Sequence, residues 1–200
     1  MNTHQTGSKF HFFRSLVLAA VLLAGLLSGC GSTPAADQAE GPRDDCGPIE
    51  PSEADVDKAL AFGREAFDST QWVKSYTVDP YKVTLTRRND TVQAIAYTEY
   101  LIFTCGYTQE DMNNYFNDEG FSIIFADYES YALDNFCEAG GLSLYEYSLV
   151  EEGTPFMAHY WVKQDTDTRI LVYMLVFPQS NPGMMDEYSQ KIFPSLSSCP

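Results

Sequence analysis

The sequence is poor in basic residues: its 200 positions hold 12 Lys and Arg against 28 Asp and Glu, a formal net charge of −16. A surface that binds nucleic acid needs clustered Lys and Arg to neutralise phosphates, so this composition excludes a nucleic-acid partner. With only 10 Pro and 13 Gly, a collagen-like or low-complexity chain is excluded too. The hydrophobic content of 44% is enough to form the packed core of one globular domain.

The chain also lacks a hydrophobic run that could span a bilayer. The apolar run at residues 16–27 would rise only about 18 Å as a helix, well short of a hydrocarbon core of ~30 Å. Lys9 and Arg14 precede it without any acidic residue, and small residues follow it. A basic start, a short apolar segment and a small-residue end are typical of a secretory signal peptide.

The end of that segment is more specific. Leu27-Ser28-Gly29-Cys30 resembles the lipobox of bacterial lipoprotein precursors, and the resemblance covers residues 1–33. It implies that the Cys30 thiol receives a diacylglycerol, that the signal peptide 1–29 is removed, and that Cys30 becomes the first residue. Two or three acyl chains anchor a protein stably. We therefore expect a lipoprotein on the extracytoplasmic face of a bacterial membrane; the alternative is an ordinary signal peptide that contains a cysteine.

A tether follows the lipidated cysteine. Residues 30–45 are rich in small and polar side chains without apolar periodicity, which predicts a flexible spacer before a single globular domain at 46–200. Loss of residues 1–29 removes two basic residues and no acidic one, so the remaining net charge is −18. Anionic lipid headgroups repel such a surface. The domain should therefore stand away from the membrane that holds it.

Four cysteines remain besides Cys30. An even number in an exported chain predicts two disulfides, which three pairings of Cys46, Cys105, Cys137 and Cys199 could satisfy. Of the three, we favour Cys46–Cys199 with Cys105–Cys137, because the first bond would join the two ends of the domain. No pair has the close spacing of zinc ligands, so neither a metal site nor a cofactor is predicted.

The periodicity of the apolar residues predicts helices and short strands. Ser52 and Asp55 form a capping box for a helix over 53–68, and Asn181-Pro182 begins a helix that Pro194 ends. Residues 91–105 suit either a strand or a helix; alanines and a terminal Gly106 favour a helix there. A short helix is expected at 108–117. The predicted strands lie at 71–78, 81–88, 121–125, 131–137, 142–150, 156–163 and 169–177.

Short strands joined by tight turns pair antiparallel, and the helices lie near the ends of the order. The expected fold is therefore α+β, an antiparallel sheet with helices packed on one face and two disulfides. A small domain of this order loosely resembles the PsbP/Mog1-like fold of some exported lipoproteins. No motif matches that family, so no functional residue is carried over from it.

Catalytic signals are weak. His159 is the one histidine outside the signal peptide, and a serine or cysteine hydrolase would need it as a general base. No GxSxG elbow accompanies it, so a hydrogen-bonded sheet histidine is the better interpretation. Paired carboxylates could run hydrolysis without histidine. The candidates that lie near aromatic residues are Glu99, Asp127, Glu129, Glu138 and Glu146.

The aromatic residues suggest a binding surface. Tyr145, Tyr147, His159 and Trp161 could form a solvent-facing platform for a glycan or peptide, although core packing is the default for such side chains. The sequence therefore predicts a non-catalytic binding or structural module of the cell envelope. Its partners would be the membrane, through the lipid, and an envelope protein or glycan. The alternative is an extracytoplasmic hydrolase that acts through paired carboxylates.

Overall fold

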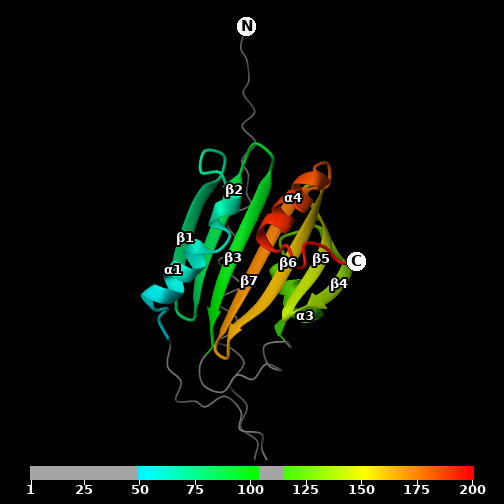
Figure 1. The fold of residues 1–200 in the computed structure, drawn as a ribbon. Coiled ribbons are helices and arrows are strands. Elements are labelled where there is room, and N and C mark those ends of the chain that lie inside the picture. Colours follow the sequence, from blue (N-terminus) through cyan, green and yellow to red (C-terminus); the bar gives the residue numbers. More distant parts are fainter. Residues whose placement is uncertain (1–48, 104–114) are drawn as a thin grey trace, which may run out of the picture.

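The computed structural model describes residues 49–103 and 115–200, in which seven antiparallel strands form one sheet (Figure 1). The order across the sheet is β1-β2-β3-β7-β6-β5-β4. This confirms the α+β class. The strands are β1 (Val73–Asp79), β2 (Lys82–Asn89), β3 (Ala94–Ile102), β4 (Ser130–Ala139), β5 (Leu142–Glu151), β6 (Thr154–Thr166) and β7 (Arg169–Pro178).

The sheet consists of two meanders with one strand between them. β1, β2 and β3 are joined by hairpins, and so are β4, β5 and β6. β7 pairs with β3 on one side and with β6 on the other. β7 is buried along nearly its whole length, as its continuous apolar sequence and its central place in the sheet require.

Two helices cover one face of the sheet. α1 (Glu53–Ala61) lies over β2 and β3, and α4 (Pro182–Ile192) lies over β7 (Figure 1). The predicted capping box at the start of α1 is present, because Ser52 and Asp55 bond reciprocally to each other's backbone. The expected helix over 53–68 ends early, at Ala61, and a turn of 3₁₀ helix, η3 (Arg64–Ala66), follows Gly63 in a left-handed conformation.

The prediction that all helices share one face is wrong. α3 (Asp118–Ile124) packs on the opposite face, where Phe121 contacts Tyr145 and Tyr160 and Phe125 contacts Tyr147. The alternation of Phe121, Ile123 and Phe125 predicted a strand at 121–125. Phe121 and Phe125 are four residues apart, so both reach the sheet from a single helical turn.

The helix predicted over residues 91–105 is also wrong, since Ala94–Ile102 is strand β3. β3 lies between β2 and β7, and its side chains are buried on both faces, Ala96 on one and Tyr97 on the other. Burial on both faces removes the alternation that would identify a strand. The helix predicted at 108–117 falls almost wholly outside the described residues.

The described residues contain one disulfide, and it differs from both predicted pairs. Cys137 on β4 is bonded to Cys199, 62 residues later in the sequence, with an S–S distance of 2.06 Å. The carboxyl end therefore lies against an edge strand of the sheet. Cys30, Cys46 and Cys105 lie outside the described residues, as does the predicted tether. None of the described helices is long and apolar enough to cross a bilayer.

Candidate functional site

His159 lies on β6 beneath α4 and contacts two residues that are typical of hydrolases. Its Nδ1 is 3.2 Å from the Ser189 hydroxyl on α4, and its Nε2 is 3.5 Å from the Glu146 carboxylate on β5. Serine, histidine and glutamate in contact resemble the composition of a catalytic triad, so their accessibility decides what they can do.

The serine is closed off from solvent. Ser189 has 0% exposed surface and faces the sheet from the middle of α4, so a substrate cannot reach its hydroxyl. Glu146 already accepts hydrogen bonds from the Cys199 backbone amide at 2.9 Å and from the Asn135 side chain at 3.0 Å. Burial lowers the pKa of His159 in spite of the nearby carboxylate. These contacts join β5, β6, α4 and the carboxyl end. His159 therefore acts as a packed core histidine that holds these elements together.

The structure does not bring the four predicted platform residues together. Tyr145 and Tyr147 face α3, whereas His159 and Trp161 lie on the other face, under α4 and the carboxyl end. Tyr147, His159 and Trp161 are buried. Trp161 donates its indole N–H to the Leu196 carbonyl at 2.8 Å. An aromatic surface formed by these four side chains is therefore not available to a ligand.

The carboxylates proposed for acid–base chemistry are also dispersed. Glu99 on β3 accepts hydrogen bonds from Lys82 and Tyr97. Glu138 and Glu146 lie on adjacent strands but bond to Ser143 and Asn135, respectively. Asp127 and Glu129 lie between α3 and β4.

A carboxyl group that the sequence analysis missed is Glu151. Partial burial, together with the negative charges of Glu152 and Asp127, raises its pKa to about 7. The sequence signal was the Glu151-Glu152 pair at the β5–β6 turn. The charge of Glu152 could be anticipated from the sequence, but the larger cause of the raised pKa of Glu151, its burial, depends on the fold.

A second unpredicted cluster fixes α1 to the sheet. Arg169 at the start of β7 bonds both carboxylate oxygens of Asp55, at 2.8 and 3.3 Å. These bonds hold the pKa of Asp55 down at about 2. Asp165 beside them accepts hydrogen bonds from Lys58 and Tyr100. Each member has a charged or hydrogen-bonding partner, so the cluster is a structural clamp.

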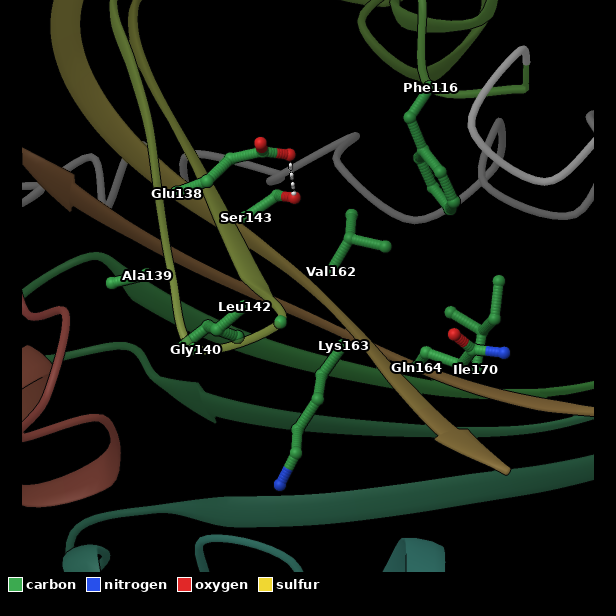
Figure 2. A pocket seen from close by; sticks show the side chains of 11 residues that line it. Phe116, Glu138, Ala139, Gly140, Leu142, Ser143, Val162, Lys163, Gln164 and Ile170 are labelled. Atoms are coloured by element: carbon green, nitrogen blue, oxygen red, sulfur yellow. Dashed lines mark hydrogen bonds between the residues drawn. The ribbon is translucent and has the colours of Figure 1, made fainter. Parts of the chain in front are cut away.

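A shallow pocket lies where the β4–β5 turn meets β6 (Figure 2). Its volume is about 440 Å³, and its lining includes Phe116, Val162 and Ile170 on one side and the Gly140-Gly141 turn on the other. The ionisable side chains in the lining are Glu138, which accepts a hydrogen bond from Ser143, and Lys163, which leaves β6 on the side opposite Val162 (Figure 2). The hydroxyl in this lining, that of Ser143, is paired with the Glu138 carboxylate and with no histidine. Nor do the described residues hold a group of three or more His, Cys, Asp or Glu that could bind a metal ion.

The exposed apolar side chains lie mainly on the two outermost strands. On β1, Val73 is 66% exposed and Tyr76 is 54% exposed. On β4, Leu133 is 47% exposed and Phe136 is 50% exposed. An edge strand has unpaired N–H and C=O groups along its outer side, so apolar side chains there favour pairing with another strand.

The two edges differ in charge. β4 and β5 carry four acidic residues, Asp134, Glu138, Glu146 and Glu151, and no Lys or Arg. The β1–β2 hairpin instead carries four basic residues, namely Lys74, Lys82, Arg87 and Arg88, and one acidic residue, Asp79. The sheet is therefore strongly acidic at its β4 edge and not at its β1 edge.

Comparison with known proteins adds no assignment: no protein-family model matches the chain, and no curated protein sequence matches it.

Proposed function

We propose that this chain is an exported lipoprotein, anchored through Cys30 at the extracytoplasmic face of a bacterial membrane, whose domain works as a binding module. The Cys137–Cys199 disulfide supports export, because disulfides persist in oxidising compartments. The lipobox-like Leu27-Ser28-Gly29-Cys30 supports anchoring.

We also propose that the second disulfide joins Cys46 to Cys105. The Tyr81 N–H donates to the Ile49 carbonyl at 2.9 Å, and the Ile102 N–H donates to the Tyr81 carbonyl at 2.8 Å. Cys46 precedes Ile49 by three residues and Cys105 follows Ile102 by three. Three residues reach up to about 10 Å, so the two thiols are within reach of each other. Peptide mapping without reduction should recover this pair; free thiols at both positions would contradict it.

The observation that supports a binding role is the contrast between the buried contact of His159 with Ser189 and Glu146 and the exposed edges of the sheet. A nucleophile needs access to its substrate, and Ser189 has none. A binding surface needs accessible apolar groups, and Tyr76 on β1 and Phe136 on β4 supply them at strands with an unpaired outer side.

Metabolic labelling tests the proposal directly. Cells that produce the full-length chain are fed an alkyne fatty acid, and the labelled protein is followed to the membrane fraction. We expect the wild type to be labelled and shortened by the signal peptide, and Cys30→Ser to be unlabelled. A wild-type chain that stays full-length, unlabelled and in the cytosol would overturn the proposal.

One observation favours the alternative, hydrolysis through paired carboxylates: the pKa of Glu151 is raised to about 7, a value that suits a general acid. Glu151→Gln and Asp127→Asn separate the two functions. Loss of glycan hydrolysis in both variants, with unchanged folding, would favour the enzyme over the binding module.

A further inference from the structure

We propose that β1 pairs antiparallel with β1 of a second copy, so that two sheets join edge to edge across a two-fold axis. This inference rests on the proposed binding function and names its partner, a second copy of this chain. It draws on the accessibility, the regularity, the charge and the apolar side chains of the β1 edge.

The β1 edge is open and regular. All seven residues of β1 are exposed, so no part of the chain that the structure describes covers the strand. Its pairing with β2 runs without a shift from Val73↔Arg88 to Asp79↔Lys82. Proteins commonly protect an edge strand with a bulge, a proline, inward-facing charges or exposed lysines. β1 carries one lysine, Lys74, but no proline, and its ladder contains no bulge.

The local charge favours a second copy here. β1 carries one basic residue, Lys74, and one acidic residue, Asp79, in a chain of net charge −16. Two copies that approached through the acidic β4 edges would repel each other, whereas two β1 edges meet without a net charge on either strand.

The apolar side chains of β1 are self-complementary. Tyr76 and Val78 lie on the same face as the buried Leu85 and Val83, their partners on β2. Antiparallel pairing about Tyr76 places the two Tyr76 rings beside each other and puts Val78 opposite Lys74 of the second copy. Cross-strand aromatic pairs and aliphatic stems of lysine both stabilise such contacts.

The tethers permit this arrangement. Ile49 bonds to Tyr81, so each chain enters its domain beside the β1–β2 turn. Antiparallel pairing separates the two turns by about the length of a seven-residue strand, roughly 23 Å. The stretch of chain from Cys30 to residue 48 can span about 60 Å if extended, so both lipids can reach one membrane. Anchoring in that membrane raises the effective concentration of one copy around another.

Cysteine cross-linking in intact cells tests the pairing. Ser75, Tyr76 and Thr77 are replaced singly by Cys in the full-length chain, which allows for a register centred on any of them. Leu133→Cys and Phe136→Cys on β4 are matched exposed controls. Opposed residues in antiparallel strands lie about 4.5–5.5 Å apart between Cα atoms, within the range of a disulfide. With a mild oxidant, we expect one of the β1 variants to form a covalent dimer at least tenfold more than either control.

Charge variants in the Tyr76→Cys background sharpen the test. Val78→Lys places a cation opposite Lys74 of the second copy and should reduce the cross-link at least fivefold. Val78→Glu places a carboxylate there and should change the yield of the cross-link by less than twofold. Peptide mapping of the Cys137–Cys199 pair confirms that each variant is folded. The proposal would be overturned if no β1 cysteine formed a dimer, or if the β4 cysteines gave as much dimer as the β1 cysteines. It would also be overturned if Val78→Glu reduced the cross-link as much as Val78→Lys, or if the cross-link joined the chain to a different protein.

Ionic strength separates this pairing from a head-to-tail contact between β1 and β4. Added salt screens the repulsion between two acidic chains, so the β1–β1 cross-link should increase between 20 and 300 mM NaCl. An attraction between unlike edges would decrease instead and would overturn the proposal. Purified protein that carries Cys30→Ser together with a β1 cysteine separates the pairing of β1 from the lipid anchoring. If the cross-link persists while the wild type takes up no lipid label, the anchoring proposal fails and the pairing stands.

Discussion

The two edges of the sheet are finished in different ways. At the β4 edge a bulge between Leu133 and Asn135 interrupts the pairing, and the Cys137–Cys199 disulfide attaches the carboxyl end to the strand. Asp134 there accepts a hydrogen bond from Ser148, at 2.6 Å. β1 has neither a bulge nor a disulfide. The difference indicates that one edge is protected against pairing and the other is left available for it.

The two halves of the sheet also depend on different bonds. Within the described residues, the β4 half has a covalent link, whereas α1 on the β1–β3 half is fixed by the ion pair between Asp55 and Arg169. A covalent bond is indifferent to pH, but an ion pair is not. Substitutions in the two halves should therefore change the free energy of unfolding by different amounts and with a different dependence on pH.

Loss of the disulfide should have the largest effect. Replacing Cys137 and Cys199 together with Ala releases a loop that closes over 62 residues, which should lower the free energy of unfolding by about 4 kcal/mol. Denaturant unfolding of the purified domain measures it. If the free energy of unfolding falls by less than about 1 kcal/mol, the His159–Ser189 contact and the hydrogen bond from Trp161 to the Leu196 carbonyl hold the carboxyl end without the disulfide.

Removal of the ion pair should come next. Asp55→Asn should lower the free energy of unfolding by about 2 kcal/mol at pH 7, since the pKa of Asp55 in the folded state is held at about 2. The stabilisation is complete above the ordinary pKa of 3.8 and is lost as the pH falls towards 2. The difference between wild type and variant should therefore shrink over that window. A constant difference would assign the effect to the helix cap instead.

Glu151→Gln should have a smaller effect on the free energy of unfolding, and one of opposite sign. The raised pKa of Glu151 stabilises the fold below the ordinary value of 4.5, and this contribution is lost as the pH rises through about 7. The variant should be about 1 kcal/mol more stable than wild type at pH 8, an estimate reduced for solvent screening, and equal to it at pH 4. Thermal unfolding at the two pH values measures this. A variant that is less stable at pH 8 would contradict it.

Exposed substitutions on the two edges should affect stability least. Tyr76→Lys on β1 and Leu133→Lys on β4 should each change the free energy of unfolding by no more than about 0.5 kcal/mol, because both side chains are largely exposed. Sedimentation of the purified chain should show weaker self-association for Tyr76→Lys only. Equal weakening by both would remove the distinction between the edges.

Much of the sheet could be predicted from the sequence. In β2, Val83 and Leu85 are buried between more exposed neighbours, so the alternation was visible. In β3 it was not, because Ala96 and Tyr97 are both buried against different layers. Phe121 and Phe125 fit the spacing of a strand and of a helix, and only the position of the aromatic residues beneath α3 decides between them.

The edges themselves could not be predicted, and neither could the disulfide. Local patterns show that a strand exists but not which strand is outermost, because that depends on β7 entering between β3 and β6. The pairing of Cys137 with Cys199 depends on the same insertion, which brings α4 and the carboxyl end towards β4. For the same reason the contact between His159 and Ser189, 30 residues apart, was not foreseen.

The central place of β7 also determines when the molecule can be completed. β7 is the last strand in the chain, and it alone connects the β1–β3 meander to the β4–β6 meander. Until it has emerged, the two meanders share no strand pairing, and Ala94–Ile102, which pairs with β2 on one side, must wait for its second partner about 75 residues downstream. The sheet of such a chain cannot be completed before its last strand arrives, an order that is compatible with the export proposed above.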